Sequence, residues 1–156
     1  VIVPVSGGGL ISGIAAAIKL LNPGVSIIGV QPEGSNATFL SFQSGERVTL
    51  KRSNTVADGL RVTEPGRVTF PLIRELVDDM VSVSEDSIME ASGRIIFQEK
   101  LLAEPSGSVP LAAVLEGKVP PEGSVAVISG GNIDPGVMAL LTEAYRGETI
   151  EEFREK

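Results

Sequence analysis

The sequence has 156 residues, a mass of 16.3 kDa and a formal net charge of −7 from 13 basic and 20 acidic side chains. This length predicts one domain with a sizeable core, and the acidic balance argues against partners such as nucleic acids or anionic membranes. Histidine and cysteine are both absent, which excludes serine–histidine triads, zinc hydrolysis, haem ligation and disulfides within this chain. No apolar run is long enough for a membrane helix and no signal peptide is visible, so we expect an intracellular, cytoplasmic protein.

The first third of the chain predicts a parallel sheet. A buried strand at Val1–Val5 ends in three glycines, and Leu10–Leu21 then has apolar residues at helical spacing. Asn22–Pro23–Gly24 stops this helix, and Val25–Val30 forms a second strand. Two strands joined through a helix make a parallel pair. Because the chain opens on a buried strand without a methionine, we expect a fragment or processed piece.

The remaining pattern extends this α/β arrangement. Ser84, followed by Glu85 and Asp86, is a favourable start for a helix. The expected elements are a helix at Thr38–Gln43, a strand at Arg47–Leu50, a helix at Phe70–Val77, a strand at Asp79–Val83, a helix from Ser84 to about Lys100, a helix opening at Glu104–Pro105, a buried strand at Ser124–Ile128 and a helix from Pro135 to about Arg146. The fold class is therefore a three-layer α/β structure, with an open, mostly parallel, twisted sheet and helices on both faces.

The segment Ser6–Leu10 is the strongest local signal for a ligand. Three glycines between a strand and a helix turn backbone N–H groups toward one point at the positive end of the helix, which is a geometry that binds phosphate. A tight turn alone would explain fewer glycines. A dinucleotide-binding loop is the alternative, with Glu33 as the ribose-binding acid, but Ser12 stands where the third glycine of that fingerprint is required.

A second glycine loop, Ser129–Gly130–Gly131–Asn132, follows the last predicted strand. Ligands of open α/β sheets gather at the carboxyl ends of the strands. The two loops together therefore predict two close backbone approaches to one flat or phosphorylated ligand.

Four motifs in this order and spacing resemble those of the threonine (serine) dehydratases and serine racemases, which are fold-type II pyridoxal-phosphate enzymes. The motifs are Ser6–Leu10, Ala57–Asp58–Gly59, Glu104–Pro105–Ser106–Gly107 and Ser129–Asn132. The resemblance covers Val1 to about Arg146 and matches the second half of such enzymes. It implies that residues 1–147 are the C-terminal part of the cofactor-binding large domain and that 148–156 is a charged tail. The small domain and the segment with the Schiff-base lysine are then absent from this chain.

The resemblance implies a cofactor, pyridoxal 5′-phosphate, and a role for individual residues. Ser6, Gly7, Gly8, Gly9 and Leu10 match the loop that holds the cofactor phosphate. Ser129, next to Gly130, matches the hydroxyl that meets the pyridine nitrogen, although a turn hydroxyl would look the same. Gly59 and Glu104 match positions beside the ring, but the start of a helix also explains Glu104. Asp58 is expected to be a structural loop acid, and Asn132 to brace the glycine turn.

The chain departs from this family pattern at two places. Many members bind a divalent cation at positions that correspond here to Gln31, Ser35 and Ala37. Hard cations favour charged oxygen ligands, so we expect no metal site, even with Glu33 nearby. In addition, no lysine of this chain lies in a segment of the Schiff-base type, and we expect no catalytic residue here.

These observations define the functional hypotheses. The first is β-elimination of threonine or serine to a 2-oxo acid and ammonia by an enzyme that joins this chain to a missing N-terminal half. The family also implies a small amino acid as substrate and a homo-oligomer. Serine racemisation is the alternative within the family. Outside it, the alternatives are a non-catalytic binding or regulatory module and a nucleotide-binding domain.

Overall fold

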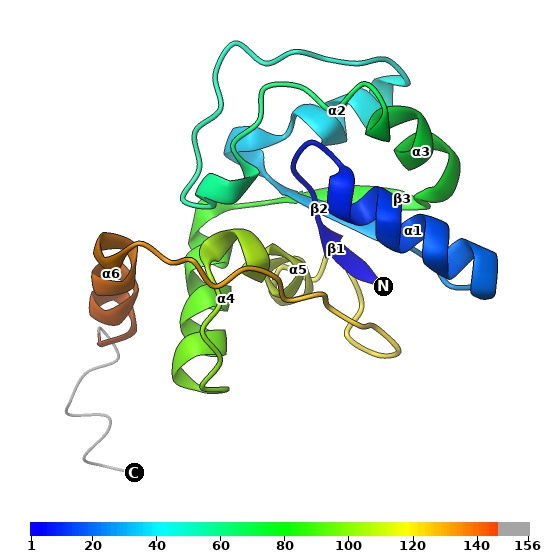
Figure 1. Ribbon diagram of the computed structural model, residues 1–156. Coiled ribbons are helices and arrows are strands. Elements are labelled where there is room, and N and C mark those ends of the chain that lie inside the picture. The colour runs from blue at the N-terminus through cyan, green and yellow to red at the C-terminus, as the bar shows by residue number, and fades with distance from the viewer. Residues whose placement is uncertain (147–156) are drawn as a thin grey trace.

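The computed structural model describes residues 1–146, and its centre is a small parallel sheet (Figure 1). The strands β1 (Ile2–Pro4), β2 (Ile28–Pro32) and β3 (Asp79–Val83) lie side by side in chain order. A fourth segment extends the sheet beyond β1, because Ile2 forms a parallel bridge with Ala126. The amide of Ile2 donates to the Val125 carbonyl at 2.8 Å, and the amide of Val127 donates to the Ile2 carbonyl at 2.9 Å.

Helices occupy most of the chain between the strands. They are α1 (Gly9–Leu21), α2 (Ala37–Ser44), α3 (Thr69–Leu76), α4 (Glu85–Phe97), α5 (Pro105–Leu115) and α6 (Pro135–Arg146), with short 3₁₀ turns η1 (Glu33–Ser35) and η2 (Asp58–Leu60). Among these described helices none is both long and apolar enough to cross a membrane.

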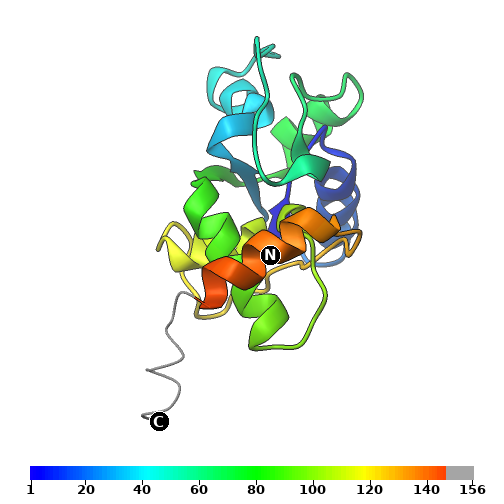
Figure 2. The ribbon, with the colours of Figure 1, turned by 90° about the vertical axis from the view of Figure 1, so that its left-hand side faces the viewer.

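Apolar side chains project from both faces of the sheet, because successive strand residues point to opposite sides. Ile2, Val30 and Val83 pack in one core with residues of α4 and α5. Val3 and Met80 pack in a second core with residues of α1 and α3. Figure 2 shows α1 and α4 on opposite sides of the strands. The predicted three-layer α/β fold with a parallel sheet is thus confirmed.

Two local predictions at helix starts are also confirmed. The hydroxyl of Ser84 caps α4 by accepting a hydrogen bond from the Ser87 amide at 3.2 Å. Pro105 is the first residue of α5, where its missing N–H costs nothing because first-turn amides have no partner within the helix.

The predicted strand at Arg47–Leu50 is wrong. This segment is irregular: the Val48 amide donates to the Ser41 hydroxyl at 2.8 Å, and the Leu50 amide donates to the Thr63 carbonyl at 2.8 Å. Its hydrogen bonds therefore go to α2 and to a neighbouring loop, and none joins it to the described sheet.

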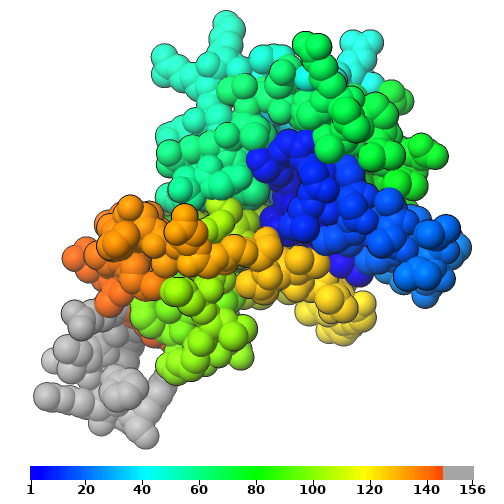
Figure 3. Space-filling model, viewed as in Figure 1, coloured from blue at the N-terminus to red at the C-terminus, as the bar shows by residue number. Residues whose placement is uncertain are grey.

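The segment Ser124–Ile128 is less regular and less buried than predicted. It makes one bridge to β1, and the exposed fractions of Val125 and Ile128 are 61% and 38%. Figure 3 shows this part of the chain, in yellow and orange, on the surface beside the first residues, in blue. The apolar run correctly indicated pairing with the sheet, but no described element covers its outer side.

Two element boundaries also differ from the predictions. The second strand begins at Ile28, three residues later than its apolar run. Helix α4 ends at Phe97 rather than at about Lys100, and Lys100 itself has a φ of 60°, which a right-handed helix cannot contain. The charged tail predicted for 148–156 lies outside the described residues.

Candidate functional site

Both glycine loops leave the sheet at the same edge. The loop Ser6–Leu10 follows β1, and the loop Ser129–Asn132 follows the segment that pairs with β1. Because the two chain segments are adjacent and parallel, their carboxyl ends lie next to each other. The arrangement that a common ligand requires is therefore present, and loops on opposite edges would have ruled it out.

The first loop is anchored through its carbonyl groups. The Ser6 carbonyl accepts a hydrogen bond from the Thr38 hydroxyl at 2.9 Å. The Gly7 carbonyl accepts from the Gly66 amide at 3.0 Å and from the Thr69 hydroxyl. These bonds hold the loop through its carbonyl groups and do not use its backbone amides.

Gly8 is the residue at which the loop needs glycine. Its φ is 98°, and a Cβ at this position would lie 2.6 Å from Cδ1 of Ile73 and 2.9 Å from the Thr69 hydroxyl. A side chain would therefore be both strained and obstructed. The close packing of Gly8 against α3 sets the path of the chain into α1.

The amides of the first loop form a candidate anion site. The backbone N–H groups of Gly7, Gly8, Gly9 and Leu10 donate to no acceptor among the described residues. They stand at the positive end of α1, whose first turn carries no acidic side chain. Amide groups in this position can donate to the oxygens of a phosphate without further rearrangement.

The second loop closes against Glu104. The Glu104 amide donates to the Gly130 carbonyl at 3.2 Å, and the amide of Asn132 donates to Oε2 of Glu104 at 3.0 Å. Gly130 has a φ of 76°, and a Cβ there would collide with the Glu104 carboxylate. The left-handed residue of this turn is thus Gly130, and Asn132 contributes its backbone rather than the side-chain brace that we predicted.

The start of α5 joins Ser129 to Gly59. A side chain at Gly107 would collide with the carbonyl of Ser129, so this glycine permits contact between α5 and the second loop. The hydroxyl of Ser106 accepts a hydrogen bond from the Gly59 amide at 2.9 Å. A Cβ at Gly59 would lie 3.4 Å from Oε1 of Glu104. Gly59, Glu104, Ser129 and Gly130 are therefore brought together.

The hydroxyl of Ser129 has no hydrogen-bond partner among the described residues. The predicted role of Asp58 as a loop acid is consistent with its Oδ1, which accepts from the Gly59 amide at 2.9 Å. No described hydrogen bond joins Ser6–Leu10 directly to Ser129–Asn132. The two loops share one edge of the sheet and leave both the amide cluster and the Ser129 hydroxyl available.

Several residues that shape this site were not predicted as site residues. Thr69 and Gly66 anchor the first loop, and Ser106 and Gly107 connect Gly59 with Ser129. A glycine inside a helical pattern, as at Gly107, is a sequence signal for close approach. The threonine and serine contacts bridge long sequence separations, and no local pattern indicates them.

Three of the described lysines make their hydrogen bonds away from the two loops. Nζ of Lys19 lies 2.7 Å from Oδ2 of Asp78, and Nζ of Lys118 lies 2.6 Å from Oε2 of Glu116. Nζ of Lys100 donates to the Phe97 carbonyl at 2.6 Å.

The residues at the positions where the resemblance implies a divalent cation, Gln31, Ser35 and Ala37, do not fit a hard cation. Oε1 of the fully buried Gln31 accepts from the Phe39 amide at 2.8 Å. The hydroxyl of Ser35 donates to the Leu60 carbonyl at 2.8 Å, and Ala37 offers no side-chain oxygen. Within residues 1–146 no cluster of three or more acidic, histidine or cysteine residues could hold a metal. The side-chain oxygens of Gln31 and Ser35, which would be the ligands of a hard cation, are thus engaged within the protein.

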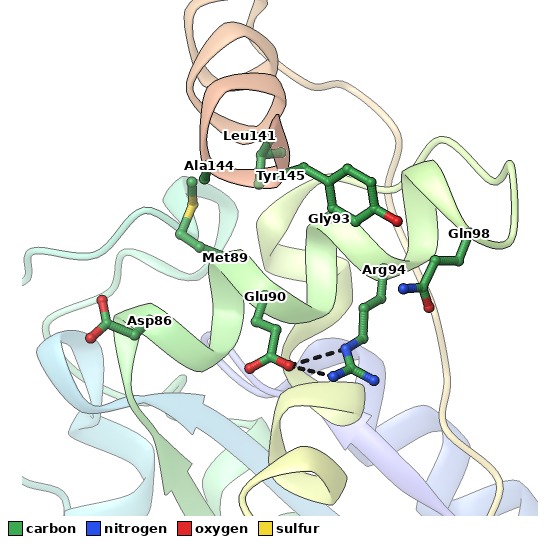
Figure 4. Close-up of a pocket in the computed structure, with 9 residues that line it drawn as sticks. All are labelled: Asp86, Met89, Glu90, Gly93, Arg94, Gln98, Leu141, Ala144 and Tyr145. Carbon is green, nitrogen blue, oxygen red and sulfur yellow. Dashed lines mark hydrogen bonds and ion pairs between the residues drawn. The ribbon is translucent and has the colours of Figure 1, made fainter. Parts of the chain in front are cut away.

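A separate cavity of about 350 Å³ lies between α4 and α6 (Figure 4). Its lining includes the ion pair of Glu90 and Arg94, whose atoms are 2.6 Å apart, and Tyr145, which stacks on Phe97. None of the predicted cofactor residues lines it. The cavity is therefore distinct from the edge of the sheet at which the two glycine loops lie.

Comparison with known proteins identifies the class. The family of pyridoxal-phosphate dependent enzymes matches residues 1–131, and the chain belongs to this family. The cofactor of the family is pyridoxal phosphate, as the resemblance predicted. This membership removes the main support for the alternative of a dinucleotide site, whose candidate acid Glu33 is exposed and lies 3.7 Å from Nζ of Lys118.

Individual relatives are narrower in activity. The chain is 45% identical over 146 residues to the catabolic L-threonine dehydratase TdcB of Escherichia coli (strain K12), covering 91% of this chain and 44% of that protein. It is 46% identical over 136 residues to the L-threonine ammonia-lyase of Thermotoga maritima, covering 86% of this chain and 34% of that protein. A serine racemase of Oryza sativa subsp. indica is 39% identical over 145 residues, covering 88% and 42%.

Solved structures agree with this assignment. The processed form of threonine deaminase isoform 2 from Solanum lycopersicum superposes with a TM-score of 0.83 at 38% identity, covering 91% of this chain and 40% of that one. Maize serine racemase gives a TM-score of 0.79 at 38% identity, covering 94% and 46%. This chain thus spans less than half the length of these relatives.

Proposed function

We propose that this chain supplies the phosphate loop and the pyridine-nitrogen partner of a pyridoxal-phosphate-dependent threonine or serine ammonia-lyase. The observation that carries the proposal is the placement of the free amides of Gly7–Leu10 and the free hydroxyl of Ser129 at one edge of the sheet of the described chain. The identity of 45% to TdcB supports threonine elimination. The whole reaction converts threonine into 2-oxobutanoate and ammonia.

The site residues fit the cofactor in charge and in shape. The amides of Gly7, Gly8, Gly9 and Leu10, together with Ser6, would hold the phosphate at the start of α1. Gly130 and Gly59 keep side chains away from the space beside Glu104. Bound pyridoxal phosphate would supply the electron sink that loss of the α-proton requires.

Ser129 decides how strong that sink would be. A carboxylate at this position would keep the pyridine nitrogen protonated, whereas the neutral hydroxyl of Ser129 would exchange a hydrogen bond without fixing a proton on the nitrogen. A weaker sink suits β-elimination, because the departing hydroxyl group of the substrate takes the electrons with it. Glu104 is held by the Asn132 amide and by its place directly before α5, so it could lie beside the cofactor ring without moving.

We propose that the base is a lysine outside this chain, in an N-terminal half that completes the enzyme. The relatives support this, since their matched regions are less than half of their lengths. Residues 1–147 would then be part of a large cofactor-binding domain, and the complete enzyme would act on a small amino acid as a homo-oligomer. Serine racemisation is the second candidate, supported by the rice and maize enzymes.

Two experiments test the proposal. Incubated alone with pyridoxal phosphate and borohydride, the chain should show no stoichiometric labelling of one lysine, and clean labelling would contradict a base outside it. Combined with a complementary N-terminal half, for example that of TdcB, it should release 2-oxobutanoate from threonine. A folded pair that binds the cofactor and yields only D-serine from L-serine would favour the racemase instead.

A further inference from the structure

Glu85 anchors the loop that brings Gly59 to the candidate site. It is the first residue of α4, directly after the strand β3 and the cap Ser84. Its Oε2 accepts hydrogen bonds from the Thr55 hydroxyl at 2.9 Å and from the Val56 amide at 2.8 Å. One carboxylate oxygen thus fixes two consecutive residues at the base of the loop 54–61.

Hydrogen bonds within the loop 54–61 connect its base, which Glu85 holds, to its other residues. The Thr55 hydroxyl accepts from the Ala57 amide at 3.1 Å, and the Thr55 carbonyl accepts from two nitrogens of the Arg61 guanidinium at 2.9 and 2.7 Å. Ala57 and Leu60 are buried in the core beside α5. Base and tip therefore move as one unit rather than independently.

The tip of the loop meets two residues of the Glu104–Gly107 motif. The Gly59 amide donates to the Ser106 hydroxyl, and Gly59 lies beside Oε1 of Glu104. A shift at Thr55 would displace Gly59 from both contacts. Within the described chain, Glu85 has no hydrogen bond to these residues that would let it act on the site directly.

The other carboxylate oxygen, Oε1 of Glu85, is buried and has no hydrogen-bond partner in the described part of the chain. Burial of an unpartnered carboxylate oxygen opposes folding. A negative charge in the first turn of α4 is favourable in itself, and the bonds of Glu85 to Thr55 and Val56 add a second contribution that ties the loop to this helix.

We propose that Glu85 is a positioning residue for the cofactor site: through Thr55 and Val56 it sets where Gly59 stands relative to Glu104 and Ser106. The proposal rests on the proposed function, since it concerns the same cofactor. Its effect should therefore appear in how tightly the cofactor binds, beyond any effect on folding.

The test compares two acidic residues at the start of α4: Glu85, which belongs to this helix, and Glu116, which follows α5 and contacts the cap residue Ser84. Oε1 of Glu116 accepts from the amide and hydroxyl of Ser84 at 2.8 and 2.7 Å, and it has no described hydrogen bond to the loop 54–61. Glu85→Ala and Glu116→Ala should both lower the unfolding free energy. At a temperature where each is folded, only Glu85→Ala should weaken noncovalent binding of pyridoxal phosphate, by about tenfold in a fluorescence titration. Glu85→Gln keeps one acceptor oxygen and should restore the affinity.

A second pair of variants covers the case in which Glu85→Ala does not fold. Thr55→Val removes the hydroxyl at the base of the loop, and Thr55→Ser keeps it. Thr55→Val should weaken binding and Thr55→Ser should not. Combined with Ser106→Ala, Thr55→Val should cost less than the product of the two separate losses, because both act through Gly59.

The outcomes separate this proposal from the function on which it rests. If the unmodified chain binds no pyridoxal phosphate, the proposed function fails. If it binds, and Glu85→Ala or Thr55→Val binds equally well, or Glu116→Ala weakens binding as much, the positioning role of Glu85 is overturned.

Discussion

The backbone amide of Asn132 donates a hydrogen bond to Oε2 of Glu104 at 3.0 Å, which joins the loop after the last sheet segment to the start of α5. The Glu104 amide returns a bond to the Gly130 carbonyl at 3.2 Å. This reciprocal pair fixes Glu104 at the point where three motifs of the sequence meet. The geometry of the candidate site therefore depends on the conformation of the Gly130 turn.

Gly130→Ala should disrupt this turn. The substitution combines a strained left-handed backbone at φ 76° with a collision against the Glu104 carboxylate. Gly117→Ala is the matched control, because Gly117 has a φ of 68° and open space around a Cβ. Gly117→Ala should lower the unfolding free energy by about 1 kcal/mol and leave affinity for pyridoxal phosphate unchanged. Gly130→Ala should lower both, and equal effects of the two variants on affinity would contradict the role of the turn.

A comparison of Gly8→Ala with Gly9→Ala tests whether the first loop requires glycine at Gly8 in particular. Gly8 has a φ of 98° and is packed against Ile73 and Thr69, whereas a Cβ at Gly9 would meet no atom within 4 Å. In urea unfolding, Gly8→Ala should cost about 2 kcal/mol or more, and Gly9→Ala should cost less than about 0.5 kcal/mol. Similar losses for both variants would show that the loop is not held as described.

Glu116 should make the stability depend on pH in acid. Partial burial acts to raise the pKa of this carboxyl, but hydrogen bonds from Lys118, from the Ser84 amide and from the Ser87 and Ser84 hydroxyls outweigh it and lower the pKa from 4.5 to about 2. A lowered folded-state pKa stabilises the fold above pH 4.5, and this stabilisation is lost as the pH falls toward 2. We expect this pH-dependent stabilisation to be about 1–3 kcal/mol. Solvent screens the interaction in part, because the side chain of Glu116 is 16% exposed and that of its partner Lys118 is 37% exposed.

The measurement is urea unfolding of the unmodified chain and of Glu116→Gln at pH values of about 6, 4 and 3, which span the expected loss. The difference in unfolding free energy between them should shrink as the pH falls. Glu90→Gln, in an exposed pair with Arg94, is the control and should show a much smaller change. A difference for Glu116→Gln that stays constant over this range would refute the assignment.

Divalent cations should have no effect on this chain, because the oxygens of Gln31 and Ser35 are already engaged within the protein. The melting temperature should change by less than about 1 °C on addition of Mg²⁺ or EDTA. The combination of Gln31→Glu with Ala37→Asp restores two carboxylates and should create a melting temperature that rises with Mg²⁺. A rise with Mg²⁺ in the unmodified chain would contradict this prediction.

The sequence predicts the regular parts of the fold well. The apolar spacing of Leu10–Leu21 corresponds to α1, and the cap at Ser84 corresponds to the start of α4. Failures occur where tertiary contacts decide. Arg47–Leu50 has strand-like residues but pairs with loops, and Ser124–Ile128 has the composition of a buried strand although its outer side is exposed.

The site is predictable to a similar extent. Glycines mark the loops at Gly8 and Gly130 because those positions need a positive φ. The contacts from Thr69 to Gly7, from Ser106 to Gly59 and from Glu85 to Thr55 are not visible in the sequence. Each is a side-chain hydrogen bond between segments that only the fold brings together, so no spacing rule can indicate it.

A shared cofactor site is tested most directly by an amide NMR titration of the isotope-labelled chain with pyridoxal phosphate. The amide signals of Gly7, Gly8, Gly9 and Leu10 should shift together with those of Ser129 and Gly130, with one common binding constant. Inorganic phosphate should shift the first group alone. Signals that move in one loop without the other on adding pyridoxal phosphate, or that move instead around the cavity between α4 and α6, would contradict a shared cofactor site.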